Sequence, residues 1–210
     1  MLQELVHGFR NYLNFKRLKN RDYEFLFNLC SEDEYIVFDT ETTGLNPKKD
    51  EILSIGAVKI KENKILSSQT FEVYLKPSGK IDAKSIEIHR IRPCDLEDAE
   101  EPQKAIEDFL NFIGCRTLVG YYLEFDVAMI NRYIKPMLGI TLPNRVIEVS
   151  EIYFEKTIEF IPQGNIDLRF DTILANCKIP NMGAHNAVND AIMTAMIFLK
   201  LKNGYKPKRI

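Results

Sequence analysis

The sequence lacks three features that would point directly to a class of protein: a basic excess, a cysteine framework and a long apolar run. Lysine and arginine total 28 against 30 acidic residues, a formal net charge of −2, so no overall positive field indicates a nucleic-acid binder. No C-x-x-C pair occurs, and we therefore expect neither zinc nor disulfides but reduced thiols. The four cysteines are Cys30, Cys94, Cys115 and Cys177.

No segment has the pattern of a signal peptide or a membrane span. Basic residues interrupt every apolar stretch near the N-terminus, and no window reaches the length of a transmembrane helix. We therefore expect a cytoplasmic protein without a membrane association. The 210 residues are 45% hydrophobic, which suits one domain with a real core and a short appendage.

Hydrophobic periodicity divides the chain into three parts. Apolar residues recur every three to four positions within residues 1–30, which predicts an N-terminal helical extension over 1–33. The main domain is expected over 34–202 and a short polar tail over 203–210. The apolar stripes of the extension should pack on the chain's own domain, with docking of a partner as the alternative. Their residues are Leu2, Leu5, Phe9, Phe25 and Leu29.

The main domain alternates strand and helix patterns. YIVFD and RTLVGY are short buried strands, and EILSIGAVKI and ILSSQTFEVYL form a hairpin through KENK. RVIEVSEIY is expected to be a further strand. Helical patterns fill the segments between them and end the domain. This order predicts an α/β fold with one mixed sheet covered by helices.

The stretch FDTETTG, residues 38–44, places two acids at the end of a strand. Residues i and i+2 of a strand share a side, so Asp39 and Glu41 project together. Two such carboxylates repel each other unless a proton or a cation lies between them. The alternative is a solvated strand-to-loop turn.

A second acid, Asp126, follows the apolar strand TLVG and opens a helix. An aspartate there stabilises a helix N-terminus by capping and through the helix dipole, whatever its function. Its position is nevertheless informative, because the carboxyl ends of buried strands are where α/β sheets bind ligands.

The third group is HNAVND, residues 185–190. Five positions make about 1.4 helical turns, so His185 and Asp190 meet only if the histidine lies on the preceding loop. Gly183 gives that loop freedom. The alternative is an aspartate that points into solvent.

Together the groups favour one chemistry. Carboxylate oxygens suit Mg²⁺ or Mn²⁺ rather than zinc, and two such ions can activate water and stabilise the leaving oxygen of a phosphodiester. A histidine with a pKa near neutrality is suited to act as general base.

In this order and spacing, FDTETTGL, VGYYLEFD and HNAVNDA resemble the motifs of the DnaQ-like (DEDDh) 3′→5′ exonucleases, which include the proofreading (epsilon) subunits of DNA polymerase III. The resemblance covers residues 34–202. It implies a ribonuclease H-like fold, a five-stranded mixed sheet flanked by helices. It also implies that His185 takes a proton from the attacking water and that four acids hold two divalent cations, Mg²⁺ or Mn²⁺. The four acids are Asp39, Glu41, Asp126 and Asp190.

The resemblance also implies substrate contacts. Leu45 is expected to wedge against the terminal base, and His89 either faces substrate or is a surface histidine ending a short helix. The second motif departs from many relatives, since Tyr121-Tyr122 replace His-Asn. These tyrosines stack on a base or pack against the sheet. The implied substrate-binding residues are Thr42, Gly44, Leu45, His89, Tyr122 and Phe125.

The function that we predict is hydrolysis of single-stranded or frayed DNA 3′ ends to nucleoside 5′-monophosphates, in polymerase proofreading or repair. RNA trimming by a family member is the alternative. A haloacid-dehalogenase-type phosphatase, suggested by the D-x-E-x-T run, and a non-catalytic nucleic-acid-binding module are more remote. The expected partners are DNA 3′ ends, or RNA, and a polymerase subunit or clamp.

Overall fold

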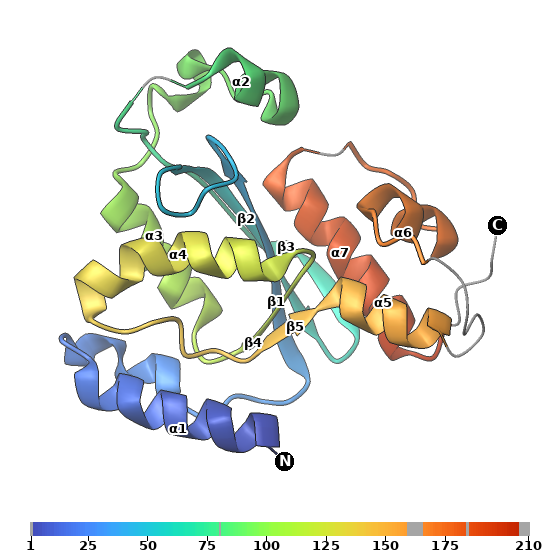
Figure 1. The fold of residues 1–210 in the computed structure, drawn as a ribbon, viewed down its shortest axis with the longest axis horizontal. Coiled ribbons are helices and arrows are strands. Elements are labelled where there is room, and N and C mark those ends of the chain that lie inside the picture. The colour runs from blue at the N-terminus through green and yellow to red at the C-terminus, as the bar shows by residue number, and fades with distance from the viewer. Residues whose placement is uncertain (1, 80, 159–165, 184, 206–210) are drawn as a thin grey trace.

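A computed structural model describes residues 2–79, 81–158, 166–183 and 185–205 (Figure 1). Its centre is one five-stranded sheet with the order β3-β2-β1-β4-β5. β1 pairs antiparallel with β2 and parallel with β4, so the predicted five-stranded mixed sheet is confirmed. The strands are β1 (Glu34–Thr42), β2 (Ile52–Lys61), β3 (Lys64–Tyr74), β4 (Thr117–Gly120) and β5 (Val146–Glu148).

The β2–β3 connection is the predicted hairpin. Glu62 and Asn63 both have positive φ, 50° and 59°, which is the conformation that a tight two-residue hairpin turn requires. β3 is an edge strand, and a single parallel bridge from Leu75 to Glu100 continues beyond its end.

Helices cover both faces of the sheet (Figure 1). One core lies between the sheet and α3 and α4, with Phe38 and Phe109 at its centre. The other lies between the sheet and α5, α6 and α7, where Val37 and Phe198 are buried. The helices of the domain are α2 (Ala83–His89), α3 (Pro102–Ile113), α4 (Leu123–Leu138), α5 (Val149–Ile158), α6 (Phe170–Asn176) and α7 (Ala187–Lys202), with the 3₁₀ turn η2 (Pro93–Leu96).

The segment RVIEVSEIY is only briefly a strand. β5 ends at Glu148 and α5 begins at Val149, because Glu148 accepts hydrogen bonds from both Ser150 N–H (3.0 Å) and Ser150 Oγ (2.7 Å) and so turns the chain into the helix. The expectation of a longer strand there is wrong.

The N-terminal extension consists of α1 (Leu2–Arg17) and a 3₁₀ helix, η1 (Arg21–Phe27). α1 turns its polar side inward: Asn11 Nδ2 donates to Pro143 O (2.9 Å) and Asn14 Nδ2 to Thr141 O (3.1 Å). The carbonyl groups of that loop need donors, so the polar face of the helix meets the domain.

The apolar residues of the extension consequently differ in burial. Leu5 and Phe9 are each 66% exposed and Leu29 is fully exposed, so the expectation that they pack on the chain's own domain is wrong. Phe25 does pack against the core. The side chain of Leu2 lies outside the described residues, as do residues 206–210 of the predicted polar tail.

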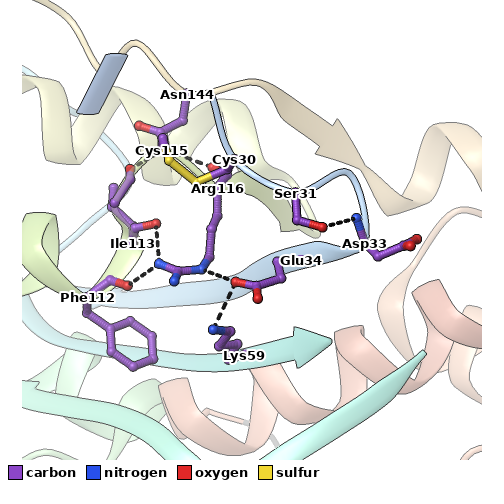
Figure 2. Close-up of a disulfide and its surroundings, with 11 residues drawn as sticks. Cys30, Ser31, Asp33, Glu34, Lys59, Phe112, Ile113, Cys115, Arg116 and Asn144 are labelled. Atoms are coloured by element: carbon purple, nitrogen blue, oxygen red, sulfur yellow. Dashed lines mark hydrogen bonds and ion pairs between the residues drawn. A yellow bond between two sulfur atoms is a disulfide. The ribbon is translucent and has the colours of Figure 1, made fainter. Parts of the chain in front are cut away.

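The expectation of four reduced cysteines is also wrong. Cys30 and Cys115 form a disulfide with Cα atoms 5.6 Å apart, although 85 positions separate them (Figure 2). Packing of η1 against the domain brings the two together, and no local spacing could reveal it. Cys94 and Cys177 are free. Among the described residues, none of the helices combines the length and the hydrophobicity that a membrane span requires.

Candidate metal and nuclease site

Three carboxylates converge at the carboxyl end of β1. Asp39, Glu41 and Asp190 each offer an oxygen, and these oxygens all lie within 4.8 Å of one another. The alternation of β1 explains two of them, because Val37, Asp39 and Glu41 share the side of the sheet that faces α7. Asp190, in the first turn of α7, completes the group.

The electrostatics of this cluster disfavour negative charge. Burial, followed by the neighbouring charges of Asp126, Glu41 and Asp190, raises the pKa of Asp39 well above its ordinary value. Burial and the charge of Asp190 raise the pKa of Glu41 to about 7. No lysine or arginine of the described residues forms an ion pair with these acids, so the cluster has a deficit of positive charge.

Asp126 lies beside this group rather than in it. It opens α4, is 4% exposed, and its Oδ1 accepts hydrogen bonds from Thr40 N–H (3.0 Å) and Thr40 Oγ1 (2.5 Å). Burial raises its pKa to about 7, against the opposing effect of the hydrogen bonds from Thr40. The carboxylate is therefore anchored to β1 through one oxygen and near enough to Asp39 to raise the pKa of that residue.

His185 and Asp190 meet in the way that their spacing required. His185 precedes α7 on a loop, and its backbone N–H donates to Asp190 Oδ2 (2.9 Å). Asn186 caps α7 by accepting from Asn189 N–H (3.0 Å). The other oxygen of Asp190, Oδ1, is buried and has no hydrogen-bond partner, an arrangement that is costly unless a ligand satisfies it.

Gly56 explains how α7 comes so close to the sheet. It lies on β2 directly opposite Asp39. A Cβ at this position would lie 2.2 Å from both the carbonyl carbon of Ala187 and the nitrogen of Val188. Only glycine lets the first turn of α7, and with it Asp190, come this near to the sheet at β2.

These observations test whether the residues suit a divalent cation. Three clustered carboxylate oxygens, raised pKa values and an unpaired buried oxygen on Asp190 all fit a bound positive charge. The donor set contains only oxygens, which hard cations prefer.

A cavity of about 320 Å³ adjoins the cluster, within the size range of ligand pockets, roughly 300–1,000 Å³. His89, which closes α2, is 3% exposed and lines this cavity; the alternative of a surface histidine is therefore wrong. Elements β1, β2, β3, α2 and α7 all contribute to the walls. The lining residues are Glu41, Ser54, Tyr74, His89, Arg90, Ile91, Asp95, Gly183, His185, Asn186, Ala187 and Asn189.

The loop after β1 has the openness expected of a substrate contact. Leu45 is 87% exposed, and Thr42 Oγ1 donates to Gly44 O (2.8 Å). A Cβ on Gly44 would lie 2.6 Å from a carboxylate oxygen of Asp50, so a side chain there would displace the Asp50 carboxylate.

The two tyrosines of the second motif differ. Tyr121 packs on Phe170 and donates to Leu168 O (2.9 Å), as the packing alternative predicted. Tyr122 is 73% exposed with φ 57°, and it does not line the cavity. Phe125 is half-buried against the core. Substrate contacts by Tyr122 and Phe125 stay predictions.

Sequence reasoning missed the residues that position these side chains. Thr40 anchors Asp126, Gly56 admits α7, and Glu148 accepts a hydrogen bond from Leu123 N–H (2.8 Å) at the start of α4. A glycine inside an apolar strand is a recognised signal of close backbone approach and could have identified Gly56. The other two depend on contacts distant in sequence.

Fold and site together define a DEDDh-type exonuclease with a ribonuclease H-like sheet. Residues 36–198 match the exonuclease family, and the chain belongs to it. Curated relatives include DNA polymerase III PolC-type from Caldanaerobacter subterraneus subsp. tengcongensis, 35% identical over 81% of this chain, and from Bacillus subtilis, 31% identical over 85%. This chain spans 12% of the length of each.

Solved structures share the fold at low identity. Cell-death related nuclease 4 aligns with a TM-score of 0.69 at 16% identity, covering 81% of this chain and 64% of its own. Escherichia coli exonuclease I in complex with a dA16 oligonucleotide aligns with a TM-score of 0.67 at 16% identity, covering 82% and 41%. Exonuclease X with 5′-overhanging duplex DNA gives 0.61 at 20% identity, covering 80% and 91%.

Proposed function

We propose that residues 34–202 form a 3′→5′ exonuclease that hydrolyses single-stranded or frayed DNA 3′ ends to nucleoside 5′-monophosphates. The observation that carries the proposal is the cluster of Asp39, Glu41 and Asp190, three carboxylates that pair with no basic side chain of the described residues and adjoin a cavity of about 320 Å³. Such a cluster has little structural value, because it opposes its own ionisation.

Asp39, Glu41, Asp126 and Asp190 are the residues that would hold two divalent cations, Mg²⁺ or Mn²⁺. When bound, such ions supply Lewis-acid stabilisation of the charge that develops on the phosphodiester oxygens. The chain's part is to hold its carboxylates in place beforehand. Thr40 holds Asp126 against β1, and Gly56 sets how closely α7, which carries Asp190, approaches the sheet. A site organised in advance stabilises a transition state without reorganising during the reaction.

His185 is the residue that takes the proton from the attacking water. It is exposed, lines the cavity beside Glu41, and is held through its backbone by Asp190, so its ring nitrogens are left for substrate and solvent. In-line attack breaks the bond to the 3′ oxygen of the preceding nucleotide, which becomes a new 3′ hydroxyl. Thr42, Gly44 and Leu45 would meet the departing nucleotide.

The biological setting that we favour is DNA polymerase proofreading or repair. The PolC-type relatives are DNA polymerases, which supports DNA as substrate and a polymerase subunit or clamp as partner. Two neighbours are exonuclease I complexes with oligonucleotides. A cytoplasmic location stays a prediction, and the Cys30–Cys115 disulfide argues against it, because disulfides are rare in the cytosol.

The test is a digestion of 5′-labelled single-stranded DNA, duplex DNA with a mispaired 3′ end, and short RNA, each with Mg²⁺, Mn²⁺ or EDTA. We expect stepwise shortening of DNA from the 3′ end, loss of activity in EDTA, and faster removal of mispaired than paired ends. Faster digestion of short RNA would make RNA trimming the function. No digestion of any substrate, with binding retained, would indicate a non-catalytic module.

A phosphatase is tested separately. A haloacid-dehalogenase-type enzyme would form a phosphoaspartate at Asp39 with a small phosphoester, and we expect none.

A further inference from the structure

Arg90 has a backbone conformation that is unusual for an arginine. Its φ is 60°, in the left-handed region that non-glycine residues seldom adopt. It follows His89 at the end of α2, and its N–H donates to Ile86 O (2.8 Å). Glycine is the usual residue at this position after a helix. Strain of this kind is concentrated at functional sites, and Arg90 lines the cavity beside Glu41 and His185.

The charge of Arg90 is unpaired. Among the residues that the structure describes, no ion pair involves this guanidinium. Asp95 also lines the cavity, but Arg92 already binds it through both carboxylate oxygens, at 3.1 Å from Nε and 2.9 Å from Nη2. The cavity therefore has an arginine without a counter-ion in its wall.

The neighbouring histidine supplies a second donor. Nδ1 of His89 accepts a hydrogen bond from Ile91 N–H (3.0 Å). In a neutral imidazole, the hydrogen must then be on Nε2. That Nε2 is buried and has no partner. Burial and the nearby His185 lower the pKa of His89, which keeps the ring neutral. The wall of the cavity therefore includes a residue whose N–H donor has no acceptor among the described residues.

We propose that Arg90, with His89 as second donor, binds a phosphate group of the substrate strand next to the linkage that is cut. An unpaired guanidinium and a fixed N–H together complement phosphate oxygens. This inference rests on the proposed nuclease function and adds a binding residue to it. The phosphate belongs either to the neighbouring internucleotide linkage or to a 3′-phosphorylated end, and the experiment separates the two.

The experiment compares the wild-type chain with Arg90→Gly, and uses Arg145→Ala as the matched control. Arg145 is also exposed but precedes β5, at the other end of the sheet. The substrates are 5′-labelled oligothymidylates with an ordinary end, with a neutral methylphosphonate at the penultimate linkage, or with a 3′-phosphate. Steady-state kinetics with Mn²⁺, anisotropy of labelled oligothymidylate in EDTA, and thermal melting are measured for each protein.

We expect Arg90→Gly to raise KM and Kd roughly 10- to 100-fold, the effect of losing charge-assisted hydrogen bonds. The kcat should change less than about twofold, because the lost contact stabilises the bound substrate and the transition state equally. Its melting temperature should rise by roughly 2–4 °C as the backbone strain is removed. That combination separates a binding role from a structural one, which would lower the melting temperature.

The modified substrates identify the phosphate. If Arg90 binds the neighbouring linkage, the methylphosphonate raises the KM and Kd of the wild-type chain by the same factor as Arg90→Gly does. It leaves the KM and Kd of Arg90→Gly unchanged. If it binds a terminal phosphate, only the 3′-phosphorylated substrate distinguishes the two proteins. Equal KM and Kd for wild type and Arg90→Gly on all substrates, while the wild type digests DNA, would overturn the inference and leave the nuclease intact. No digestion and no binding by the wild type would instead reject the proposed function.

Discussion

The two ends of β1 carry acids in opposite electrostatic situations. At the amino end, Glu34 accepts from Arg116 Nε (2.8 Å) and lies 2.9 Å from Lys59 Nζ (Figure 2). Lys61 Nζ lies 3.0 Å from the other carboxylate oxygen of Glu34. These three cations lower its pKa to about 2. At the carboxyl end, no lysine or arginine in the described part of the chain pairs with Asp39 or Glu41, and the pKa values of these two acids are raised.

This difference in charge environment shows that one strand of nine residues has a stabilising acid at one end and acids suited to a ligand at the other. A carboxylate surrounded by cations stabilises the charged folded state, whereas clustered carboxylates without cations destabilise it. Nothing in the fold needs the second arrangement. We infer that the carboxyl end of β1 is kept for a ligand, and that the amino end, with its disulfide, holds the sheet together.

The largest expected effect comes from neutralising the carboxyl end. Asp39→Asn should reduce exonuclease activity roughly 10³-fold or more, since electrostatic groups that act on the transition state are worth this much. It should not lower the melting temperature measured without metal, because it removes a buried charge that repels its neighbours. Oligonucleotide digestion and thermal melting are the measurements. Glu155→Gln, an exposed substitution on α5, serves as the control.

A large loss of stability in Asp39→Asn without metal would contradict the comparison. It would mean that this carboxylate stabilises the fold in the way that Glu34 does.

The second prediction separates the position of the acids from their identity. Gly56→Ala leaves every acid in place but sets a Cβ against the backbone of α7. Displacement of Asp190 by about 1 Å should reduce kcat on the order of 10²-fold and weaken Mn²⁺ binding measured by calorimetry. Gly79→Ala is the control, since a Cβ there meets nothing within 4 Å. Circular dichroism checks that the variant is folded; a folded Gly56→Ala with normal Mn²⁺ affinity would contradict the positioning role.

The residues of the candidate site also show which features the sequence can predict. The pairing of Asp39 with Glu41 followed from strand alternation, and the approach of His185 to Asp190 from their spacing before a helix. Both depend on local geometry, which periodicity describes. The sheet and its helical layers could be predicted for the same reason.

What could not be predicted depends on contacts distant in sequence. Cys30 and Cys115 are 85 positions apart, and no pattern in either segment pairs them. The inward polar face of α1 depends on the carbonyl groups of Thr141 and Pro143, and the burial of His89 depends on the assembled fold around α2. Such features follow from the assembled fold rather than from any window of sequence.

The third prediction concerns the disulfide at the amino end. Reduction, or Cys30→Ser, should lower the free energy of unfolding by about 4 kcal/mol, the order expected for a loop of this length, and leave kcat unchanged because the acids lie at the other end of the sheet. Urea unfolding and oligonucleotide digestion with and without dithiothreitol are the measurements. Cys94→Ser, at an exposed free thiol, is the control. A change in kcat at constant stability would show that the two ends of β1 are coupled.

The smallest expected effect comes from the acid at the amino end itself. Glu34→Gln should lower the free energy of unfolding by about 2 kcal/mol at pH 7, after allowance for solvent screening, and leave activity within about twofold. The pKa of Glu34 is lowered from 4.5 to about 2. Its contribution to stability is therefore complete above pH 4.5 and is lost as the pH falls from 4.5 towards 2.

Urea unfolding at pH 7, 5, 4 and 3 should accordingly show a constant difference between wild type and Glu34→Gln down to pH 5, and a shrinking one below it. A difference that persists undiminished at pH 3 would mean that Glu34 acts through packing or neutral hydrogen bonds. The contrast between the two ends of β1 would then be one of geometry rather than of charge.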